Sequence, residues 1–150
     1  MKRILTILAL LARMCFQLGA QEDMVASLME RLQHERLTFT YSCTIDAGGL
    51  PVNSSGTVTA QGNCYKVSAQ GVDIYCDGST RWLVDTAAKE VYIEAAEGLG
   101  EFLAAPQDYL GALSDLKYST PKSVPATEEL GDFRFDCSKL DDNWVVTDLR

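Results

Sequence analysis

The chain has 150 residues, 47% of them hydrophobic, with 13 lysines and arginines against 21 aspartates and glutamates and a net charge of −8 at pH 7. This length is enough for one domain with a substantial hydrophobic core. The acidic balance excludes nucleic acids and anionic membrane surfaces as partners, because both attract basic patches.

Residues 1–20 have the pattern of a cleavable signal peptide. Lys2 and Arg3 form a basic start, an apolar run follows at 4–11, and Leu18-Gly19-Ala20 supplies the small residues that precede a cleavage site. The run is shorter than the about 20 apolar residues that a membrane-spanning helix needs. We therefore expect an exported protein whose residues 21–150 form a single domain. An N-terminal core helix is the alternative interpretation.

Cys15 offers another interpretation of the same segment, acylation of the cysteine, which would anchor the protein to a membrane. Residues 12–14 read Ala-Arg-Met and lack the small residue that this modification requires just upstream.

Cleavage near Ala20 would remove three of the 13 basic residues, so ten would remain against 21 acidic ones. The net charge of the processed chain would then be −11.

Two elements with different periods are expected at the start of residues 21–150. Residues 22–36 predict an amphipathic helix, because apolar residues recur there at helical spacing. From residue 38 the period changes to two, which indicates a half-buried strand ending at the glycines near 48. The apolar members of the helix are Met24, Val25, Leu28, Met29 and Leu32, and those of the strand are Phe39, Tyr41, Cys43 and Ile45.

Residues 64–76 predict a β-hairpin that follows a polar strand at about 55–60. With a turn at Gln70-Gly71, Val67 faces Ile74 and Tyr65 faces Cys76, and the polar and apolar side chains separate completely. A slip of one residue would mix them, so this register is favoured. Strands at 80–84 and 90–94 follow through short turns and complete an antiparallel meander.

The rest of the chain predicts an insertion and a closing pair of strands. Residues 101–105 and 108–116 predict short helices separated by Pro106, and residues 119–129 predict a loop. Closing strands are expected near 133–137 and 144–149. The fold class is therefore α+β, with a curved antiparallel sheet, an N-terminal helix and a short helical insertion.

Residues that could carry catalysis are scarce. His34 is the single histidine and lies beside charged residues, which indicates a solvated position. Asp141-Asp142 could pose as paired acids, but adjacent residues on a turn usually point apart. The sequence contains no phosphate-binding glycine motif and no cluster with metal-ligand spacing. We expect no enzymatic activity, no metal site and no cofactor.

Four cysteines follow residue 20, namely Cys43, Cys64, Cys76 and Cys137. An even count in an oxidising compartment favours disulfides, and the absence of a Cys-x-x-Cys pair disfavours zinc. In the expected register Cys64 lies on the polar side of the sheet and the other three on apolar sides. At least one disulfide is expected, with its pairing left open.

Residues 61–94, QGNCYKVSAQGVDIYCDGSTRWLVDTAAKEVYIE, resemble the outer-membrane lipoprotein carrier (LolA-like) family, in a shortened Bacteroides-type version. The most specific feature is the D-G-x-T-x-W turn, formed here by Asp77, Gly78, Thr80 and Trp82. Residues 101–113 and 133–150 are similar to the helical segment and the closing strands of that family. The resemblance touches most of residues 21–150.

The resemblance implies an open, incomplete β-barrel whose apolar concave face takes acyl chains, with helices at its mouth. It implies a periplasmic carrier or chaperone that binds lipoprotein acyl chains, or other lipid, and transfers them towards the outer membrane. An inner-membrane release complex and an outer-membrane acceptor would be its partners, and it would act as a monomer. The implied lipid-binding residues are Phe39, Tyr41, Ile45, Val67, Ile74 and Trp82, with Met24, Leu28 and Leu32 filling the cavity when it is empty.

Two features depart from the family pattern. Only residues 117–131 separate the helical segment from the closing strands, which predicts a smaller sheet and a shallower cavity. The family also holds its lid helices with an arginine on an early strand, and residues 38–69 contain Lys66 as their one basic residue. A non-carrier periplasmic interaction or sensor module on the same scaffold is therefore the alternative function. A small secreted hydrolase is a third hypothesis.

Overall fold

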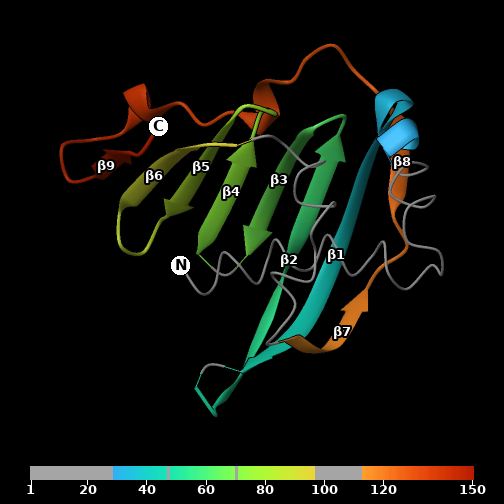
Figure 1. Cartoon of the computed structure of the whole chain (residues 1–150), viewed down its shortest axis with the longest axis horizontal. Helices are drawn as coiled ribbons and strands as arrows, with labels where there is room; N and C mark the ends of the chain where they lie inside the picture. The colour runs from blue at the N-terminus through green and yellow to red at the C-terminus, as the bar shows by residue number, and fades with distance from the viewer. Residues whose placement is uncertain (1–28, 47, 70, 97–112) are drawn as a thin grey trace.

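The computed structural model describes residues 29–46, 48–69, 71–96 and 113–150 (Figure 1). The expected signal peptide, Met24, Leu28 and most of the expected helical insertion lie outside these residues. Residues 29–34 are helical and form the end of the expected N-terminal helix. No helix within the described ranges is long and apolar enough to cross a membrane.

The described strands form one open sheet in the order β7-β1-β2-β3-β4-β5-β6-β9, and β8 pairs with β1 beyond this path. The hydrogen-bonded path does not join β9 back to β7, so the sheet is not closed into a barrel. The strands are β1 Glu35–Asp46, β2 Pro51–Gln61, β3 Cys64–Ala69, β4 Val72–Cys76, β5 Thr80–Asp85, β6 Glu90–Ala95, β7 Leu113–Tyr118, β8 Lys122–Pro125 and β9 Val145–Asp148.

The predicted β3–β4 hairpin is confirmed residue by residue. Val67 pairs with Ile74, Tyr65 with Cys76, and Lys66 with Tyr75. Gly71 has a φ of +83°, the left-handed conformation that a tight turn requires and that glycine adopts without strain. The pattern determines this register because a one-residue slip would exchange the two faces of both strands.

The predicted end of the chain is partly wrong. In place of a strand at 133–137 there are two 3₁₀ turns, η2 at Gly131–Phe133 and η3 at Cys137–Lys139. Asp136 accepts a hydrogen bond from the Ser138 amide at the start of η3, which favours the turn over an extended strand. The final strand, β9, exists but pairs in parallel with β6, so the sheet is mixed and not wholly antiparallel.

Two further predictions between residues 113 and 129 are corrected. The helix expected to reach residue 116 is replaced there by β7, which pairs antiparallel with β1. The loop expected at 119–129 contains the short strand β8, which pairs with the start of β1. Pro125 at the end of β8 fits this position, because proline is tolerated in edge strands but not in central ones.

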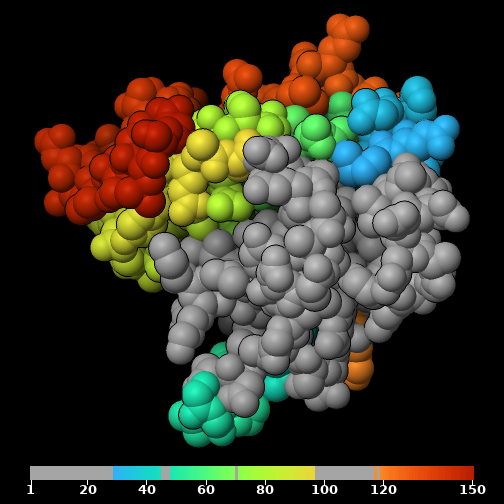
Figure 2. Space-filling view, in the orientation of Figure 1, coloured from blue at the N-terminus to red at the C-terminus, as the bar shows by residue number. Residues whose placement is uncertain are grey.

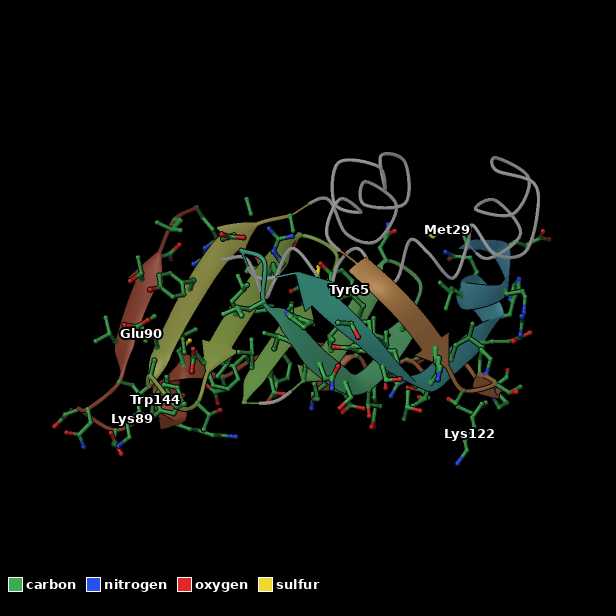
Figure 3. The ribbon with its side chains drawn as sticks, turned by 90° about the horizontal axis from the view of Figure 1, so that it is seen from below. Met29, Tyr65, Lys89, Glu90, Lys122 and Trp144 are labelled. Carbon is green, nitrogen blue, oxygen red and sulfur yellow. The ribbon has the colours of Figure 1, made fainter. Side chains whose placement is uncertain are left out.

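The sheet is apolar mainly on one side over β1–β4, and from β5 onwards a second apolar layer covers the other side. On one side, here called the apolar face, lie Phe39, Val67 and Ile74, which are 6%, 0% and 0% exposed. On the other side, the opposite face, a second cluster gathers around Val84, Val91 and Ile93. The C-terminal segment packs against this second cluster, and Figure 3 shows Trp144 beneath the ribbons of β5 and β6. Partly buried members of the cluster are Tyr75, Trp82, Phe135, Cys137, Leu140 and Trp144.

Candidate functional site: the apolar face of the sheet

A continuous row of apolar side chains crosses six strands on the apolar face. Partners in a β-ladder lie on the same side of a sheet, so the registers join one residue from each of β1 to β6 into a single row. Its first five members are buried, and the last is 37% exposed. In strand order the row is Phe39, Val58, Val67, Ile74, Leu83 and Tyr92.

The two neighbouring rows begin apolar on β1 and become charged on β5 and β6. One row contains Tyr65 and Cys76 and ends in Arg81 and Glu94, and the other contains Ala69 and Val72 and ends in Asp85 and Glu90. The apolar surface is therefore broad over β1–β4 and narrows to the central row over β5–β6. It is bordered at its far end by ionised side chains.

The structure brings four of the predicted lipid-binding residues together on this face, namely Phe39, Tyr41, Val67 and Ile74. Leu32, on the helical turn at 29–34, is 1% exposed, and its carbonyl accepts a hydrogen bond from the Gly62 amide. Ile45 pairs with Val52 in the β1–β2 ladder, but its side chain lies outside the described part. The same holds for Met24 and Leu28.

Trp82 lies away from the other predicted residues. It pairs with Tyr75, while its neighbour Leu83 pairs with Ile74, so the indole belongs to the opposite face. The segment Trp82-Leu83-Val84 is apolar throughout because β5 is covered on both sides. Its sequence therefore has no alternation from which the side of Trp82 could be predicted.

Tyr41 places a hydroxyl within the apolar face. Its ring crosses β2 over Gly56, because a Cβ built on Gly56 would lie 2.9 Å from the Tyr41 hydroxyl oxygen and 3.0 Å from Cε1. Glycine at this strand position leaves the space that the ring occupies and also avoids the Ser68 carbonyl oxygen, which would lie closer still to such a Cβ. Burial raises the pKa of Tyr41 to about 12, and the nearby Ser54 hydroxyl offsets only part of the shift. No group among the described residues lies at both the distance and the angle that a hydrogen bond to this hydroxyl requires.

An ion pair closes the charged end of the face. Arg81 and Glu94 lie across the β5–β6 ladder with 2.5 Å between Nη2 and Oε2, and each side chain is 25% exposed. Arg81 also interacts with the buried Tyr65, whose pKa is raised mainly by burial. Burial likewise raises the pKa of the Cys76 thiol, which keeps it protonated and unsuited to nucleophilic chemistry.

The D-G-x-T-x-W residues build a turn and do not face the apolar row. Asp77 Oδ1 accepts hydrogen bonds from the Ser79 amide, the Ser79 hydroxyl and the Thr80 amide, at 3.1, 3.1 and 2.9 Å. Gly78 adopts a φ of +96°, which glycine tolerates. Asp77 Oδ2 pairs with Arg134 at 3.1 Å, which ties the turn to the C-terminal segment.

Asp77 should therefore contribute to stability in a pH-dependent way. Burial alone would raise its pKa, but the hydrogen bonds from Thr80 and Ser79 outweigh burial and lower the pKa below 3.8. A lowered carboxyl pKa gives stability that is complete above pH 3.8 and is lost as the pH falls through the folded-state pKa. We expect Asp77→Asn to lower the free energy of unfolding by about 1–2 kcal/mol at pH 7.

Urea unfolding between pH 3 and pH 7 checks this expectation. The difference between wild type and Asp77→Asn should stay constant above pH 5 and shrink below pH 3.8. Asp142→Asn, a change at an exposed turn, is the matched control and should stay within about 0.5 kcal/mol of wild type. A difference for Asp77→Asn that does not depend on pH would contradict the role given to the ionised carboxylate.

The structure joins no two of Cys43, Cys64, Cys76 and Cys137 by a disulfide. The expected crosslink is therefore absent among the described cysteines. Cys64 lies on the opposite face, as expected, but is only 6% exposed, because η2 packs against β3 there. Cys64 and Cys76 lie on adjacent strands and on opposite faces of the sheet, which keeps their thiols apart.

Arg36 is a structural residue that sequence reasoning missed. Strand β1 begins at Glu35 and not at residue 38, so an arginine does lie on an early strand. Its guanidinium donates to Gln61 Oε1 at 3.0 Å, to Asp132 Oδ2 at 2.8 Å and to the Glu129 carbonyl at 3.1 Å. It points to the opposite face, as Thr38 does, so it anchors residues 129–132 and does not reach the apolar row.

Comparison with known proteins identifies no family or relative for this chain. A scan against protein-family models matches no family, and no curated protein is significantly similar to the chain. Within the described ranges, no group of three or more His, Cys, Asp or Glu side chains could hold a metal ion. The apolar face is therefore the feature on which a functional assignment can be built.

Proposed function

We propose that the protein is a periplasmic carrier that binds the acyl chains of lipoproteins, or other lipid, on the apolar face of its sheet. The observation that carries the proposal is the unbroken apolar row from Phe39 on β1 to Leu83 on β5. A soluble acceptor for a lipid chain needs such a surface, because each buried CH₂ contributes about 0.8 kcal/mol. The broad apolar area over β1–β4 and its charged border suit a chain with a polar head.

The row is long enough for one acyl chain. Adjacent strands are about 4.8 Å apart, so the four steps from β1 to β5 span roughly 19 Å. One leaflet of a bilayer core is about 15 Å thick, and an acyl chain that spans the leaflet therefore has about this length. A chain lying across the strands would contact Val58, Val67 and Ile74 in turn.

Loading then requires a conformational change, since the side chains of the row are buried. In the proposed cycle, the helical segment that carries Leu32 gives way to the acyl chain and returns when the chain is handed on. Both states bury apolar surface, so the exchange is close to balanced, as reversible carriage requires. The inner-membrane release complex and the outer-membrane acceptor named above would be the donor and the recipient.

A matched pair of valines tests the proposal. Val67 and Val91 are both 0% exposed, but Val67 lies in the row and Val91 in the cluster on the opposite face. Phenylalanine at either position should overpack the interior and cost about 1–3 kcal/mol. Only Val67→Phe should fill the path of the acyl chain, so we expect it alone to weaken binding, by about tenfold or more.

Binding of Nile red and its displacement by 1-palmitoylglycerol provide the measurement, with urea unfolding to show that the two variants are equally destabilised. A wild-type protein that binds neither molecule would refute the carrier function. Equal weakening by Val67→Phe and Val91→Phe would show that the apolar face is not the binding surface.

The alternative, a non-carrier interaction or sensor module, is favoured by different residues. The tip of the β1–β2 hairpin projects from the sheet, as Figures 1 and 2 show, and Leu50 there is 70% exposed. On β9, Val145 and Val146 are 59% and 44% exposed. Exposed apolar residues that gather in a contiguous patch are typical of protein-binding surfaces. A protein that binds no lipid but loses a partner on Leu50→Ser or Val146→Ser would support this function.

A further inference from the structure

The apolar face contains one polar atom that the protein leaves unsatisfied. Tyr41 is 3% exposed, and among the described residues its hydroxyl is the buried side-chain polar atom that makes no hydrogen bond; the Ser54 hydroxyl is near enough to lower its pKa but is not in hydrogen-bonding position. The hydroxyl of Tyr65, the other deeply buried tyrosine on this face, is not among the unsatisfied atoms and interacts with Arg81 and Cys76. Burying an unpaired hydroxyl is unfavourable, and phenylalanine would avoid the cost.

The position of the hydroxyl relates it to the proposed acyl path. Tyr41 lies two residues along β1 from Phe39, and its ring extends over Gly56 on β2. Gly56 in turn lies two residues from Val58, the second member of the row. The hydroxyl is therefore beside the row at its β1–β2 end, opposite the end that Arg81 and Glu94 close.

The chemistry of the hydroxyl restricts what can satisfy it. With a pKa of about 12 the phenol remains protonated at neutral pH, so it can donate a hydrogen bond. A hydrocarbon or an ether-linked alkyl chain lacks a good acceptor, whereas an ester-linked acyl chain has a carbonyl oxygen at its head. An ionised fatty acid also has acceptors, but burying its charge in an apolar face is costly.

We propose that Tyr41 recognises the carbonyl of a bound acyl ester and thereby makes the protein selective for ester-linked acyl chains over alkyl chains of the same length. This inference rests on the proposed carrier function. In the loaded state the Tyr41 hydroxyl donates to the ester carbonyl oxygen, and the hydrocarbon tail extends along Val58, Val67 and Ile74 towards β5. No covalent step is involved.

Two lipids that differ only at the carbonyl test the inference, 1-palmitoylglycerol and 1-O-hexadecylglycerol, each displacing Nile red. We expect wild type to bind the ester about three- to tenfold more tightly than the ether, the effect of one net hydrogen bond. Tyr41→Phe should abolish this preference by weakening binding of the ester, while its affinity for the ether stays unchanged.

Tyr65→Phe is the matched control. Because Tyr65 has a partner, its replacement should lower stability to urea, whereas Tyr41→Phe should leave the lipid-free protein unchanged or more stable. A Tyr41→Phe variant as destabilised as Tyr65→Phe would overturn the premise that the hydroxyl is unpaired. Equal wild-type affinity for the two lipids would overturn the inference but not the carrier function. Failure of wild type to bind either lipid would overturn the carrier function itself.

Discussion

Replacing Phe133 by alanine is expected to lower the free energy of unfolding by about 3–5 kcal/mol, a large part of the roughly 5–15 kcal/mol that stabilises a typical domain. Phe133 is 0% exposed, where η2 packs against β3. The Arg36 guanidinium carbon lies 5.0 Å from the centre of its ring, so truncation also removes a cation–π contact. The resulting cavity cannot collapse easily, because the sheet beneath it is held by backbone hydrogen bonds.

Urea unfolding followed by tryptophan fluorescence measures this effect. Val124→Ala is the control, because Val124 is 51% exposed and its truncation should change stability by no more than about 0.5 kcal/mol. If Phe133→Ala were no more destabilised than Val124→Ala, the C-terminal segment would not belong to the cooperative fold. If the protein has the proposed function, Phe133→Ala should retain its preference between ester and ether while folded, because Phe133 packs on the opposite face.

The features that the sequence predicts correctly are local and fully alternating. In the β3–β4 hairpin Ser68 faces Asp73 and Lys66 faces Tyr75, while the apolar residues of the other side face one another, so a single register is compatible with a buried side. The meander from β2 to β6 follows for the same reason. Spacing thus places Phe39 with Tyr41 on one side of β1 and Val67 with Ile74 on one side of the hairpin, whereas the expectation that all four share one face came from the resemblance to the carrier family.

The features that the sequence predicts wrongly depend on contacts that spacing does not encode. Trp82 lies in an apolar run that is buried on both sides, so its face is decided by its pairing with Tyr75. Phe133 and Phe135 alternate as in a strand, but Phe133 is buried and Phe135 partly buried by packing onto the sheet and not by joining it. The parallel pairing of β9 with β6 joins segments about 55 residues apart, and no local turn signals it.

The unpaired state of Tyr41 was also beyond sequence reasoning. A tyrosine in an alternating strand is usually a core residue with its hydroxyl reaching a partner or water. Only the ring's position over Gly56, seen in the structure, shows that the hydroxyl is retained inside the face. A side chain at Gly56 would meet both this ring and the Ser68 carbonyl oxygen, which explains why a strand interior contains a glycine, although glycine otherwise weakens a strand.

Replacing Ile74 by alanine is the second change with a large expected effect, a loss of about 2–5 kcal/mol in the free energy of unfolding. Ile74 is 0% exposed at the middle of the row, between Val67 on β3 and Leu83 on β5. The conservative variant Ile74→Val removes one methylene and should cost only about 0.5–1.5 kcal/mol. Urea unfolding of wild type and the two variants should therefore give a graded series.

Ile93, 7% exposed in the cluster on the opposite face, provides the control that separates stability from binding. Ile93→Ala should lose a comparable amount of stability, because its methyl groups are also buried, yet it should bind 1-palmitoylglycerol as wild type does. Ile74→Ala should bind 1-palmitoylglycerol with an affinity that differs from that of wild type, because the cavity left by the truncated side chain lies in the acyl path. If the two alanine variants were equal in binding as well as in stability, the row would be ordinary core, and its length and continuity would carry no function.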